Sequence, residues 1–269
     1  MPEGFAITGS VAVVTGGGSG IGRALCHALA QAGARHVVVT DLGGAAADAV
    51  AAAINAAYPR KPASAMQLDV TDAAAVARAI DTIEREIGPV ALVCSNAGVH
   101  AGEGLGDADA WRRSLDVNLL AHVHVAGAVL PRMAARRSGH LVITASAAGL
   151  LTDFRCAPYA ASKHAAVALA EWLAITHADD GIAVSCVCPE GVKTGMTRPD
   201  SIRTGAANAF LAPEDVARAI LDALATRRFL VLPHPRVADY EQRRAADRET
   251  WLERMRAVRR KLTPTRVAS

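Results

Sequence analysis

The sequence predicts a single α/β domain, built on a doubly wound parallel sheet of about seven strands with helices on both faces. Short apolar runs alternate with longer helix-like runs along the chain, a pattern typical of strands that pair in parallel through crossover helices. A glycine-rich turn directly follows the first apolar run. The 269 residues, 51% of them hydrophobic, suffice for one sizeable core and leave no room for a second domain.

The expected strands are apolar runs that end in polar or glycine-containing turns. They span Val11–Thr15, His36–Thr40, Ala63–Leu68, Val90–Ser95, His140–Thr144, Ile182–Cys188 and Phe229–Leu232. The expected helices span Gly20–Ala32, Ala45–Ala57, Ala73–Ile87, Asp109–Arg136, Tyr159–Asp179, Pro213–Thr226 and Val237–Lys261. Because such sheets bind ligands at the carboxyl ends of their strands, polar residues at these ends are the candidate site residues.

The first strand and the first helix are joined by the sequence TGGGSGIG, from Thr15 to Gly22. Free N–H groups and the positive end of the helix dipole make a helix start a binding site for phosphate. Gly16, Gly20 and Gly22 have no Cβ and so allow a pyrophosphate to approach the backbone. Their spacing differs from the usual dinucleotide fingerprint, and an ordinary tight turn is the alternative.

Asp41 ends the second strand, roughly 19 residues beyond Gly22, where dinucleotide-binding units place a carboxylate beside the adenosine ribose. A carboxylate there hydrogen-bonds a free 2′-hydroxyl and repels a 2′-phosphate. The residue before Gly20 is Ser19, so the turn offers no cation to a 2′-phosphate. These residues favour NAD over NADP, and the alternative for Asp41 is a role as a helix cap or turn former.

Two further turns follow predicted strands. Asp69 and Val70 come after the third strand, and Asn96, Ala97 and Gly98 come after the fourth. Together with the glycine turn, these motifs resemble the short-chain dehydrogenase/reductase family, and the resemblance covers about Gly9 to Leu232. It implies a Rossmann fold that binds a dinucleotide cofactor through these residues and through Ile21 in the first turn of the helix.

Tyr159 and Lys163 lie four residues apart on a predicted helix, so both side chains share one face. A phenol is a poor base at neutral pH, and we expect the neighbouring ammonium to lower the pKa of Tyr159. The resemblance implies that Tyr159 transfers the proton, that Lys163 also binds the nicotinamide ribose and that Ser146 orients the substrate oxygen. It also implies that Asn118 supports a water on the proton path, with a structural buried Asn as the alternative.

The segment after the sixth strand contains Pro189, Val192 and Thr194, which match family positions that meet the nicotinamide carboxamide. Family members usually have glycine where this chain has Glu190. If that position requires a positive φ, the glutamate adds backbone strain. Otherwise we expect its carboxylate to face the pocket or a neighbouring subunit.

A substrate loop spans about residues 190–211, and Gly195–Leu211 within it is predicted to form a mobile lid. Apolar residues of the lid and of nearby turns predict a mainly apolar substrate pocket: Met196, Ile202, Phe210 and Leu211, with Val99, Leu150, Leu151 and Phe154. Three arginines lie near these loops: Arg155, Arg198 and Arg203. We expect them to be solvated, and contact with an acidic substrate is the alternative.

The motifs together predict an NAD-dependent oxidoreductase that interconverts a secondary alcohol and a ketone by hydride transfer, with Tyr159 as general acid and base. An NADP-dependent carbonyl reductase is one alternative. A dinucleotide-sensing protein without catalytic activity is another. The sequence names neither the substrate nor the direction of the reaction.

Composition and charge narrow the partners. The formal charge of +3 is concentrated between residues 236 and 266, which carry ten Lys/Arg and five Asp/Glu and leave the rest of the chain at −2. No nucleic-acid-binding module accompanies this basic segment, and no apolar run is long enough to span a bilayer. We therefore expect a cytoplasmic protein without nucleic-acid or membrane partners. The five cysteines are expected in the core, and His122 and His124, two apart on a helix, do not predict a metal site.

Residues 236–269 are predicted to form a basic amphipathic tail of the same domain, whose dinucleotide-binding catalytic part spans residues 1–235. Trp251, Met255, Val258 and Leu262 recur at helical spacing and form one apolar stripe. The family resemblance implies a homo-oligomer, with a homotetramer favoured over a dimer. We expect the stripe to pack across a subunit boundary, and packing on its own subunit is the alternative.

Overall fold

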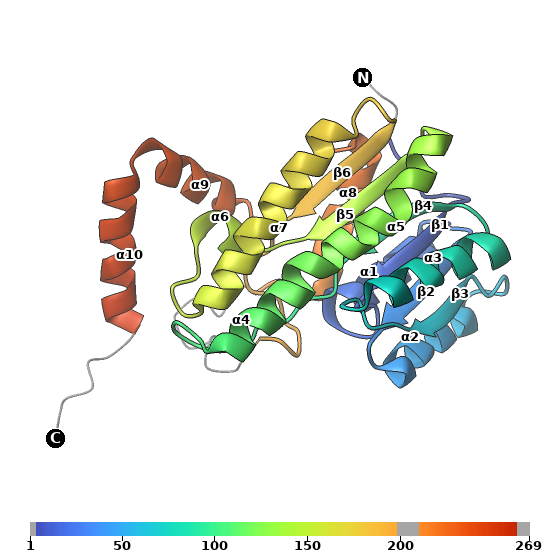
Figure 1. Ribbon diagram of the computed structural model, residues 1–269, viewed down its shortest axis with the longest axis horizontal. Coiled ribbons are helices and arrows are strands. Elements are labelled where there is room, and N and C mark those ends of the chain that lie inside the picture. The colour runs from blue at the N-terminus through green and yellow to red at the C-terminus, as the bar shows by residue number, and fades with distance from the viewer. Residues whose placement is uncertain (1–3, 198–209, 263–269) are drawn as a thin grey trace.

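The computed structural model describes residues 4–197 and 210–262. Its parallel strands form one sheet in the order β3-β2-β1-β4-β5-β6-β7 (Figure 1). The direction of winding changes between β1 and β4, which is where sheets of this kind leave a crevice for a ligand. The predicted doubly wound fold is confirmed. The strands are β1 (Val11–Thr15), β2 (His36–Asp41), β3 (Ala63–Gln67), β4 (Val90–Ser95), β5 (Gly139–Thr144), β6 (Ile182–Val187) and β7 (Leu230–Val231).

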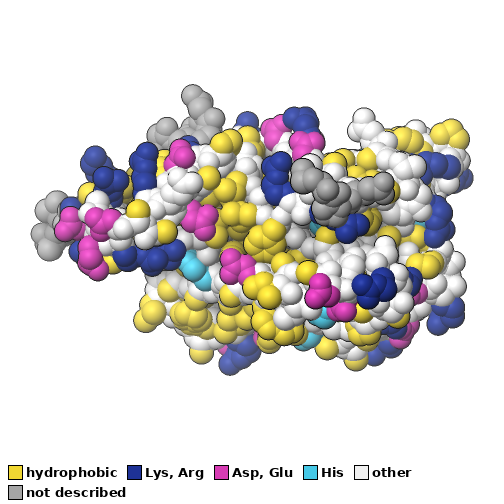
Figure 2. All heavy atoms as spheres, turned by 90° about the horizontal axis from the view of Figure 1, so that it is seen from above, with side chains coloured by type: hydrophobic (Ala, Val, Ile, Leu, Met, Phe, Trp, Pro, Cys, Tyr) yellow, Lys and Arg dark blue, Asp and Glu magenta, His cyan; other side chains and the backbone are white. Residues whose placement is uncertain are grey.

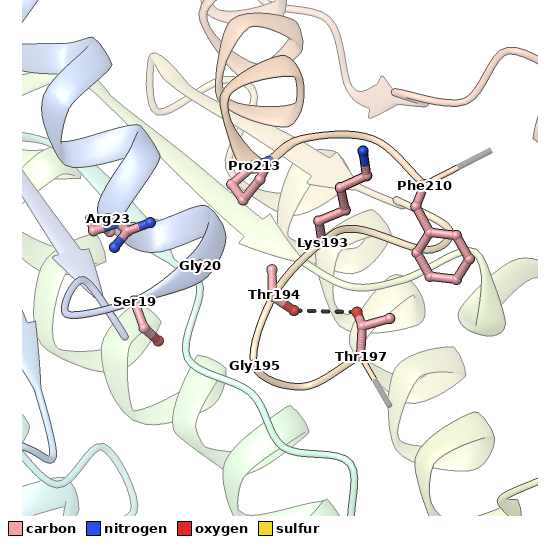
Figure 3. A pocket seen from close by; sticks show the side chains of 9 residues that line it. All are labelled: Ser19, Gly20, Arg23, Lys193, Thr194, Gly195, Thr197, Phe210 and Pro213. Carbon is pink, nitrogen blue, oxygen red and sulfur yellow. Dashed lines mark hydrogen bonds between the residues drawn. The ribbon is translucent and has the colours of Figure 1, made fainter. Parts of the chain in front are cut away.

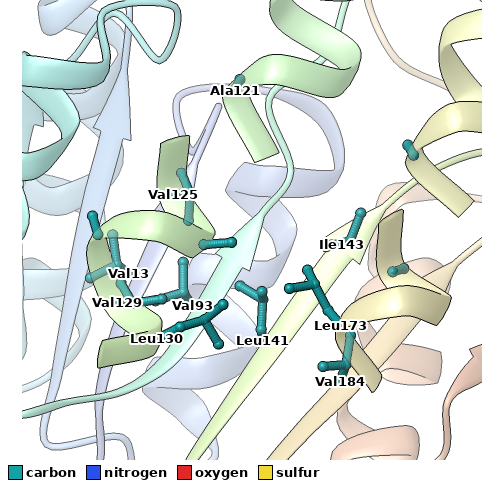
Figure 4. Close-up of a cluster of buried hydrophobic side chains, with 14 of the residues drawn as sticks. Val13, Val93, Ala121, Val125, Val129, Leu130, Leu141, Ile143, Leu173 and Val184 are labelled. Carbon is teal, nitrogen blue, oxygen red and sulfur yellow. The ribbon is translucent and has the colours of Figure 1, made fainter. Parts of the chain in front are cut away.

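Two buried clusters cover the two faces of the sheet. On β1, Val11 and Val13 point into one cluster, while Ala12 and Val14 point into the other. Figure 4 shows part of the first cluster, where Val13 lies near Val125 and Val129 of the helix Ala121–Arg136. Burial on both faces explains why these strands read as continuous apolar runs. The first face is covered by α3 (Ala73–Glu86), α5 (Ala121–Arg136) and α7 (Ala157–Thr176), and the second by α1 (Gly20–Gln31), α2 (Gly44–Ala57) and α8 (Pro213–Thr226).

The helix predicted over Asp109–Arg136 is interrupted. The structure has α4 (Ala108–Leu115), then a π-helical turn η1 (Asp116–Leu120), and then α5. A π-turn inserts about one residue into a continuous helix, so it hardly changes the apolar periodicity from which the helix was predicted. The short helix α6 (Ala148–Leu151) was not predicted either, because four residues are too few to show a period.

The tail was predicted as one helix over Val237–Lys261, and that prediction is wrong in one respect. It forms α9 (Arg236–Ala246) and α10 (Arg248–Leu262), with a break at Asp247. The Asp247 carboxylate accepts hydrogen bonds from the backbone N–H and the hydroxyl of Thr250, at 3.0 and 2.7 Å, and so caps the second helix. This break turns α10 away from the body of the molecule (Figure 1).

The predicted stripe on α10 is only partly buried. Trp251 is 9% exposed and packs against Tyr240 of α9, with 6.2 Å between ring centroids. Val258 and Leu262 remain 40% and 39% exposed. Figure 2 shows Lys and Arg side chains, interspersed with Asp and Glu, around this projecting end of the molecule.

Two further predictions concern the class of protein. In the part of the chain that the structure describes, no helix is both long and apolar enough to cross a bilayer. All five cysteines are buried and none forms a disulfide, which confirms the prediction of core cysteines. Their thiols fill apolar space, and burial raises the pKa of Cys26 to about 12, so that thiol stays protonated.

Candidate active site

The glycine turn brings the start of α1 into close contact with the ends of β1 and β4. Gly16 has φ +63°, and a Cβ there would lie 2.9 Å from the Cα of Ala97. A Cβ on Gly22 would lie 2.1 Å from the carbonyl oxygen of Gly16 and 2.8 Å from the side-chain nitrogen of Asn96. The turn therefore has no room for a side chain at Gly16 or Gly22, and this close packing positions the start of α1 beside the ends of β1 and β4.

Ser19 and Ile21 flank the start of α1 differently. Ser19 occupies the N-cap position, but its hydroxyl does not cap the helix. It lines a cavity of about 410 Å³ between the glycine turn and the segment after β6 (Figure 3). Ile21 points inward and packs against the core cluster on the α1 side of the sheet. Of this predicted pair, only Ser19 lines the cavity.

Asp41 is fixed beside the glycine turn. One carboxylate oxygen accepts the backbone N–H of Gly18 at 2.9 Å, and the other accepts the N–H of Gly43 at 3.0 Å. Each oxygen retains further acceptor capacity, because a carboxylate oxygen has about two lone-pair sites. The negative charge is thus held at one place at the end of β2, which is the position predicted for contact with the ribose.

The Asn-Ala-Gly motif links β4 to β1. The N–H groups of Asn96 and Ala97 donate to the hydroxyl of Thr15 at 2.9 and 3.1 Å, and the Asn96 side chain donates to the Thr15 carbonyl at 3.1 Å. A Cβ on Gly98 would lie 3.3 Å from the Asn118 side-chain oxygen and 3.5 Å from Lys163 Nζ. Gly98 therefore marks the point where the cofactor crevice and the predicted catalytic residues meet.

Asp69 and Val70 shape the neighbouring turn. The hydroxyl and the N–H of Thr71 donate to the Asp69 carboxylate, at 2.7 and 2.9 Å, and hold its pKa below the ordinary value. Val70 is 8% exposed, and its carbonyl lies 3.1 Å from Nδ1 of His124. These contacts fix the conformation of the turn. Both residues follow β3 and lie at the carboxyl edge of the sheet.

Asn118 lies in the π-turn and is fully buried. Its side-chain oxygen accepts the N–H of Val99 at 2.8 Å, and its side-chain nitrogen donates to the Val99 carbonyl and to the Ser162 hydroxyl, both at 3.0 Å. The amide thus ties the turn after β4 to α7, the helix that carries Tyr159. A π-turn widens the spacing of backbone hydrogen bonds and is frequent at functional sites.

Ser146, Tyr159 and Lys163 meet at the end of β5. The Lys163 ammonium is 3% exposed and donates to the Thr144 carbonyl at 2.9 Å, and it lies 6.0 Å from the centre of the Tyr159 ring. The Ser146 hydroxyl donates to the Pro189 carbonyl at 3.4 Å and accepts the N–H of Ala148 at 3.1 Å. The predicted serine, tyrosine and lysine are therefore brought together.

The pKa of Tyr159 shifts in the direction opposite to our expectation. Burial raises it above the ordinary value, and a hydrogen bond with Ser146 only partly offsets the increase. Burial also lowers the pKa of Lys163, to about 8. The Lys163 ammonium donates to the Thr144 carbonyl and lies 6.0 Å from the centre of the ring, and burial outweighs the groups that lower the Tyr159 pKa. The phenol is therefore protonated at neutral pH.

The segment after β6 contacts both halves of the site. Val192 is buried and forms an isolated bridge with Leu211, and a Cβ on Gly20 would lie 3.0 Å from the side chain of Thr194. Glu190 is not among the residues with positive φ, so the strain considered for it is absent. The lid residues 198–209, with Arg198 and Arg203, lie outside the described residues. The cavity of Figure 3 is lined by Ser19, Gly20, Arg23, Lys193, Thr194, Gly195, Thr197, Phe210 and Pro213.

Comparison with known proteins bears on this geometry. The sequence model of a family described as short chain dehydrogenase matches residues 10–204. A 1-deoxy-11-beta-hydroxypentalenate dehydrogenase of Streptomyces avermitilis is 41% identical over 229 residues, which cover 82% of this chain and 83% of that protein. The chain is a short-chain dehydrogenase. The family predicted from the motifs is confirmed.

Other short-chain dehydrogenases are similar over most of their length. A meso-2,3-butanediol dehydrogenase of Serratia marcescens is 37% identical over 197 residues, covering 72% of this chain and 76% of that protein. Among solved structures, a short-chain dehydrogenase/reductase from Burkholderia phymatum in complex with NAD has a TM-score of 0.82 at 32% identity. The match covers 91% of this chain and 96% of the Burkholderia chain. This protein is thus an oxidoreductase, and a solved structure with the same fold contains bound NAD.

This short-chain dehydrogenase has residues beside Tyr159 that the sequence did not point to. The ring of His100 lies 4.7 Å from the Tyr159 ring, between centroids, at a 35° tilt. The Asp153 carboxylate accepts three hydrogen bonds from Arg155, one from its backbone N–H and two from its guanidinium, all at 2.9 Å. Although burial alone would raise the Asp153 pKa, these bonds hold it below its ordinary value. The Arg155 side chain is 56% exposed, as expected for a solvated arginine, and it is also paired with Asp153. These residues belong to no motif and come together only by folding.

The expected apolar pocket residues differ in position. Leu150 is 7% exposed and belongs to the core cluster on the α5 and α7 side of the sheet. Leu151 is partly buried against the same cluster. Val99 holds the Asn118 amide with its backbone groups. Of the residues predicted to line an apolar pocket, Leu150 and Leu151 thus pack in or against the core, and Val99 holds the Asn118 side chain in place.

Gly22→Ala tests the close contact within the glycine turn. We expect the variant to bind NADH at least about tenfold more weakly, because the new methyl group displaces the Gly16 carbonyl and Asn96 and misplaces the anion-binding backbone. Gly127→Ala is the matched control, since a Cβ at Gly127 meets nothing within 4 Å. Binding is measured by calorimetry and stability by thermal unfolding. Wild-type affinity in Gly22→Ala would contradict a tight approach at this turn.

Proposed function

We propose that this short-chain dehydrogenase interconverts a secondary alcohol and a ketone with NAD, using Tyr159 as general acid and base. The observation that supports it most directly is the meeting of Ser146, Tyr159 and Lys163 at the carboxyl end of β5, opposite the glycine turn. Relatives named as hydroxypentalenate and butanediol dehydrogenases support a small hydroxyl-bearing substrate. An NADP-dependent carbonyl reductase and a catalytically silent dinucleotide sensor are the alternatives.

The residues of the crevice fit a nicotinamide dinucleotide. Gly22 packs against the Gly16 carbonyl with no room for a Cβ, which brings the start of α1 close to the glycine turn, and the first turn of α1 supplies N–H groups for the pyrophosphate. Asp41 provides the carboxylate for the adenosine ribose. Asp69 and Val70 border the adenine side, and Pro189, Val192 and Thr194 border the nicotinamide side. When bound, the cofactor supplies the hydride acceptor or donor.

The catalytic residues divide the remaining work. Ser146 donates a hydrogen bond to the substrate oxygen and holds it beside the Tyr159 hydroxyl. In the reductive direction Tyr159 donates its proton to that oxygen as negative charge develops on it, which a buried, protonated phenol is suited to do. Lys163 binds the nicotinamide ribose and provides positive charge near the phenol. Asn118 fixes the π-turn through which the proton path reaches solvent.

Location and assembly complete the proposal. Five buried cysteines without disulfides support a reducing compartment, and we place the protein in the cytoplasm. We further propose a homotetramer in which the catalytic part, residues 1–235, is followed by the tail that meets a neighbouring subunit. The exposed Val258 and Leu262 on α10 support this arrangement, because apolar side chains in a row gain most when a partner covers them.

Tyr159→Phe is expected to reduce kcat at least about 100-fold, because it removes the proton donor. NAD binding should stay nearly unchanged. The reaction is followed at the absorbance of NADH with a panel of secondary alcohols and ketones. Tyr58→Phe, the same chemical change far from the site, should keep wild-type activity.

The raised Tyr159 pKa also predicts how the rates of the two reaction directions depend on pH. Because burial raises the Tyr159 pKa, the phenolate needed to accept a proton from the alcohol forms only at alkaline pH. Alcohol oxidation in the wild type should therefore rise with pH through the alkaline range, and ketone reduction should fall.

For the Tyr159→Phe variant, retention of more than about a tenth of the wild-type kcat would rule out this acid–base role.

Asp41→Ser tests cofactor choice. The wild type should prefer NAD, since the fixed carboxylate repels a 2′-phosphate at close range. Serine keeps an acceptor for the Gly18 N–H but removes the charge, so kcat/KM should rise with NADP and fall with NAD. Asp48→Ser, on the exposed side of α2, is the control. Equal kcat/KM with the two cofactors in the wild type would refute the role of Asp41.

A double variant, Val258→Asp with Leu262→Asp, tests the tail. It places charge on the exposed stripe and should reduce the oligomer mass measured by light scattering. Relative to wild type, the KM for the alcohol should rise more than the KM for NAD. Arg256→Asp lies on a different face of α10 and changes the net charge by the same amount. Only the double variant should dissociate; wild-type mass and kinetics in both would show that the stripe serves no interface.

A further inference from the structure

Glu190 joins the segment after β6 to the C-terminal part of the chain. Its carboxylate accepts a hydrogen bond from Arg236 Nε at 2.5 Å, and its backbone N–H donates to Nδ1 of His234 at 3.2 Å. The Glu190 side chain is 19% exposed and the Arg236 side chain 42%. His234 is 5% exposed. Glu190 is therefore anchored twice, by its side chain and by its backbone.

The neighbours of Glu190 are part of the proposed site. The carbonyl of Pro189 accepts the N–H of Ala147 at 2.8 Å and the Ser146 hydroxyl at 3.4 Å. On the other side, Thr194 lies against Gly20 in the glycine turn. A shift of the backbone at Glu190 therefore reaches the serine on one side and the cofactor crevice on the other.

The ion pair is poorly placed to stabilise the fold. Partly exposed pairs of this kind contribute about 0–1 kcal/mol, because water screens the charges and both side chains lose freedom. Misplacement of a reacting group by about 1 Å, in contrast, can cost about 100-fold in rate. Geometry at the site is thus the larger effect that this pair can have.

We propose that Glu190 and Arg236 are positioning residues, a clamp that holds residues 189–194 against the nicotinamide half of the cofactor and orients Ser146. The inference rests on the proposed function, because it assigns the nicotinamide half to this segment. It gives α9 a task in the active site of its own subunit. It also explains how the chain accommodates glutamate at this position, since Arg236, the first residue of α9, and His234, which precedes the helix, bond to it.

The test compares two ligands that differ in the nicotinamide half. NADH reaches both the glycine turn and residues 189–194, whereas ADP-ribose lacks the nicotinamide and reaches only the first. Glu190→Ala and Arg236→Ala are each expected to weaken NADH binding, and to lower kcat, by about tenfold, with ADP-ribose binding and thermal stability nearly unchanged. Arg243→Ala, an exposed arginine on the same helix, should behave as wild type.

The double variant tests whether the two residues act as one unit. If they form a clamp, Glu190→Ala with Arg236→Ala should lose about as much NADH affinity as either single change. Equal losses for NADH and ADP-ribose, unchanged NADH affinity in both single variants, or full additivity in the double variant would overturn the clamp. A wild type that binds NADH but oxidises no alcohol would instead overturn the proposed function, and the binding comparison would still decide on the clamp.

Discussion

A buried ammonium is the constraint on which the rest of the site depends. Lys163 is 3% exposed, and an ammonium out of water is unfavourable unless polar groups receive it, which is why its pKa falls to about 8. The Thr144 carbonyl receives one of its protons at the end of β5. This contact fixes α7 against the sheet, and α7 in turn carries the Tyr159 phenol to the same strand end. A lysine at this position therefore determines both the electrostatics and the geometry.

Space around that ammonium is limited by the turn after β4. Gly98 passes close to Lys163 and Asn118, and a Cβ there would lie tightly against the Asn118 side-chain oxygen at 3.3 Å and in ordinary contact with Lys163 Nζ at 3.5 Å. The Asn118 side-chain oxygen accepts the Val99 N–H, and its nitrogen donates to the Val99 carbonyl and to the Ser162 hydroxyl on α7. The π-turn is the backbone change that brings this amide inward. Cofactor crevice and catalytic residues are thus coupled by a few hydrogen bonds and by the absence of one Cβ.

The sequence was sufficient for those parts of the site that depend on local pattern. Apolar runs predicted all the strands, since burial on both faces leaves a continuous apolar signal, and the spacing of Tyr159 and Lys163 correctly predicted a shared helix face. The sequence could not give the direction of the Tyr159 pKa, because that depends on how deeply the phenol is buried and on which acceptor the lysine finds. It also missed His100 and Asp153, whose approach to the tyrosine depends on loops without periodicity. The break at Asp247 was missed because a capping aspartate resembles any other polar residue on an exposed helix.

The C-terminal part of the chain shows how one sequence position can change the role of a distant one. Where glycine would leave the segment after β6 without a side-chain anchor, Glu190 presents a carboxylate, and Arg236 lies at the first residue of α9 to meet it. The buried Val237 packs α9 against the body of the molecule, near α6. The break at Asp247 then releases α10 from that surface. The tail is therefore two elements with different physical constraints. In α9, Val237 is fully buried in the core cluster on the α5 and α7 side of the sheet, and Arg236 pairs with Glu190 next to the site. In α10, Trp251 is buried, whereas Leu252, Val258 and Leu262 are exposed. In the proposed oligomer, that division would let α10 contact another subunit without disturbing the proposed catalytic groups of its own.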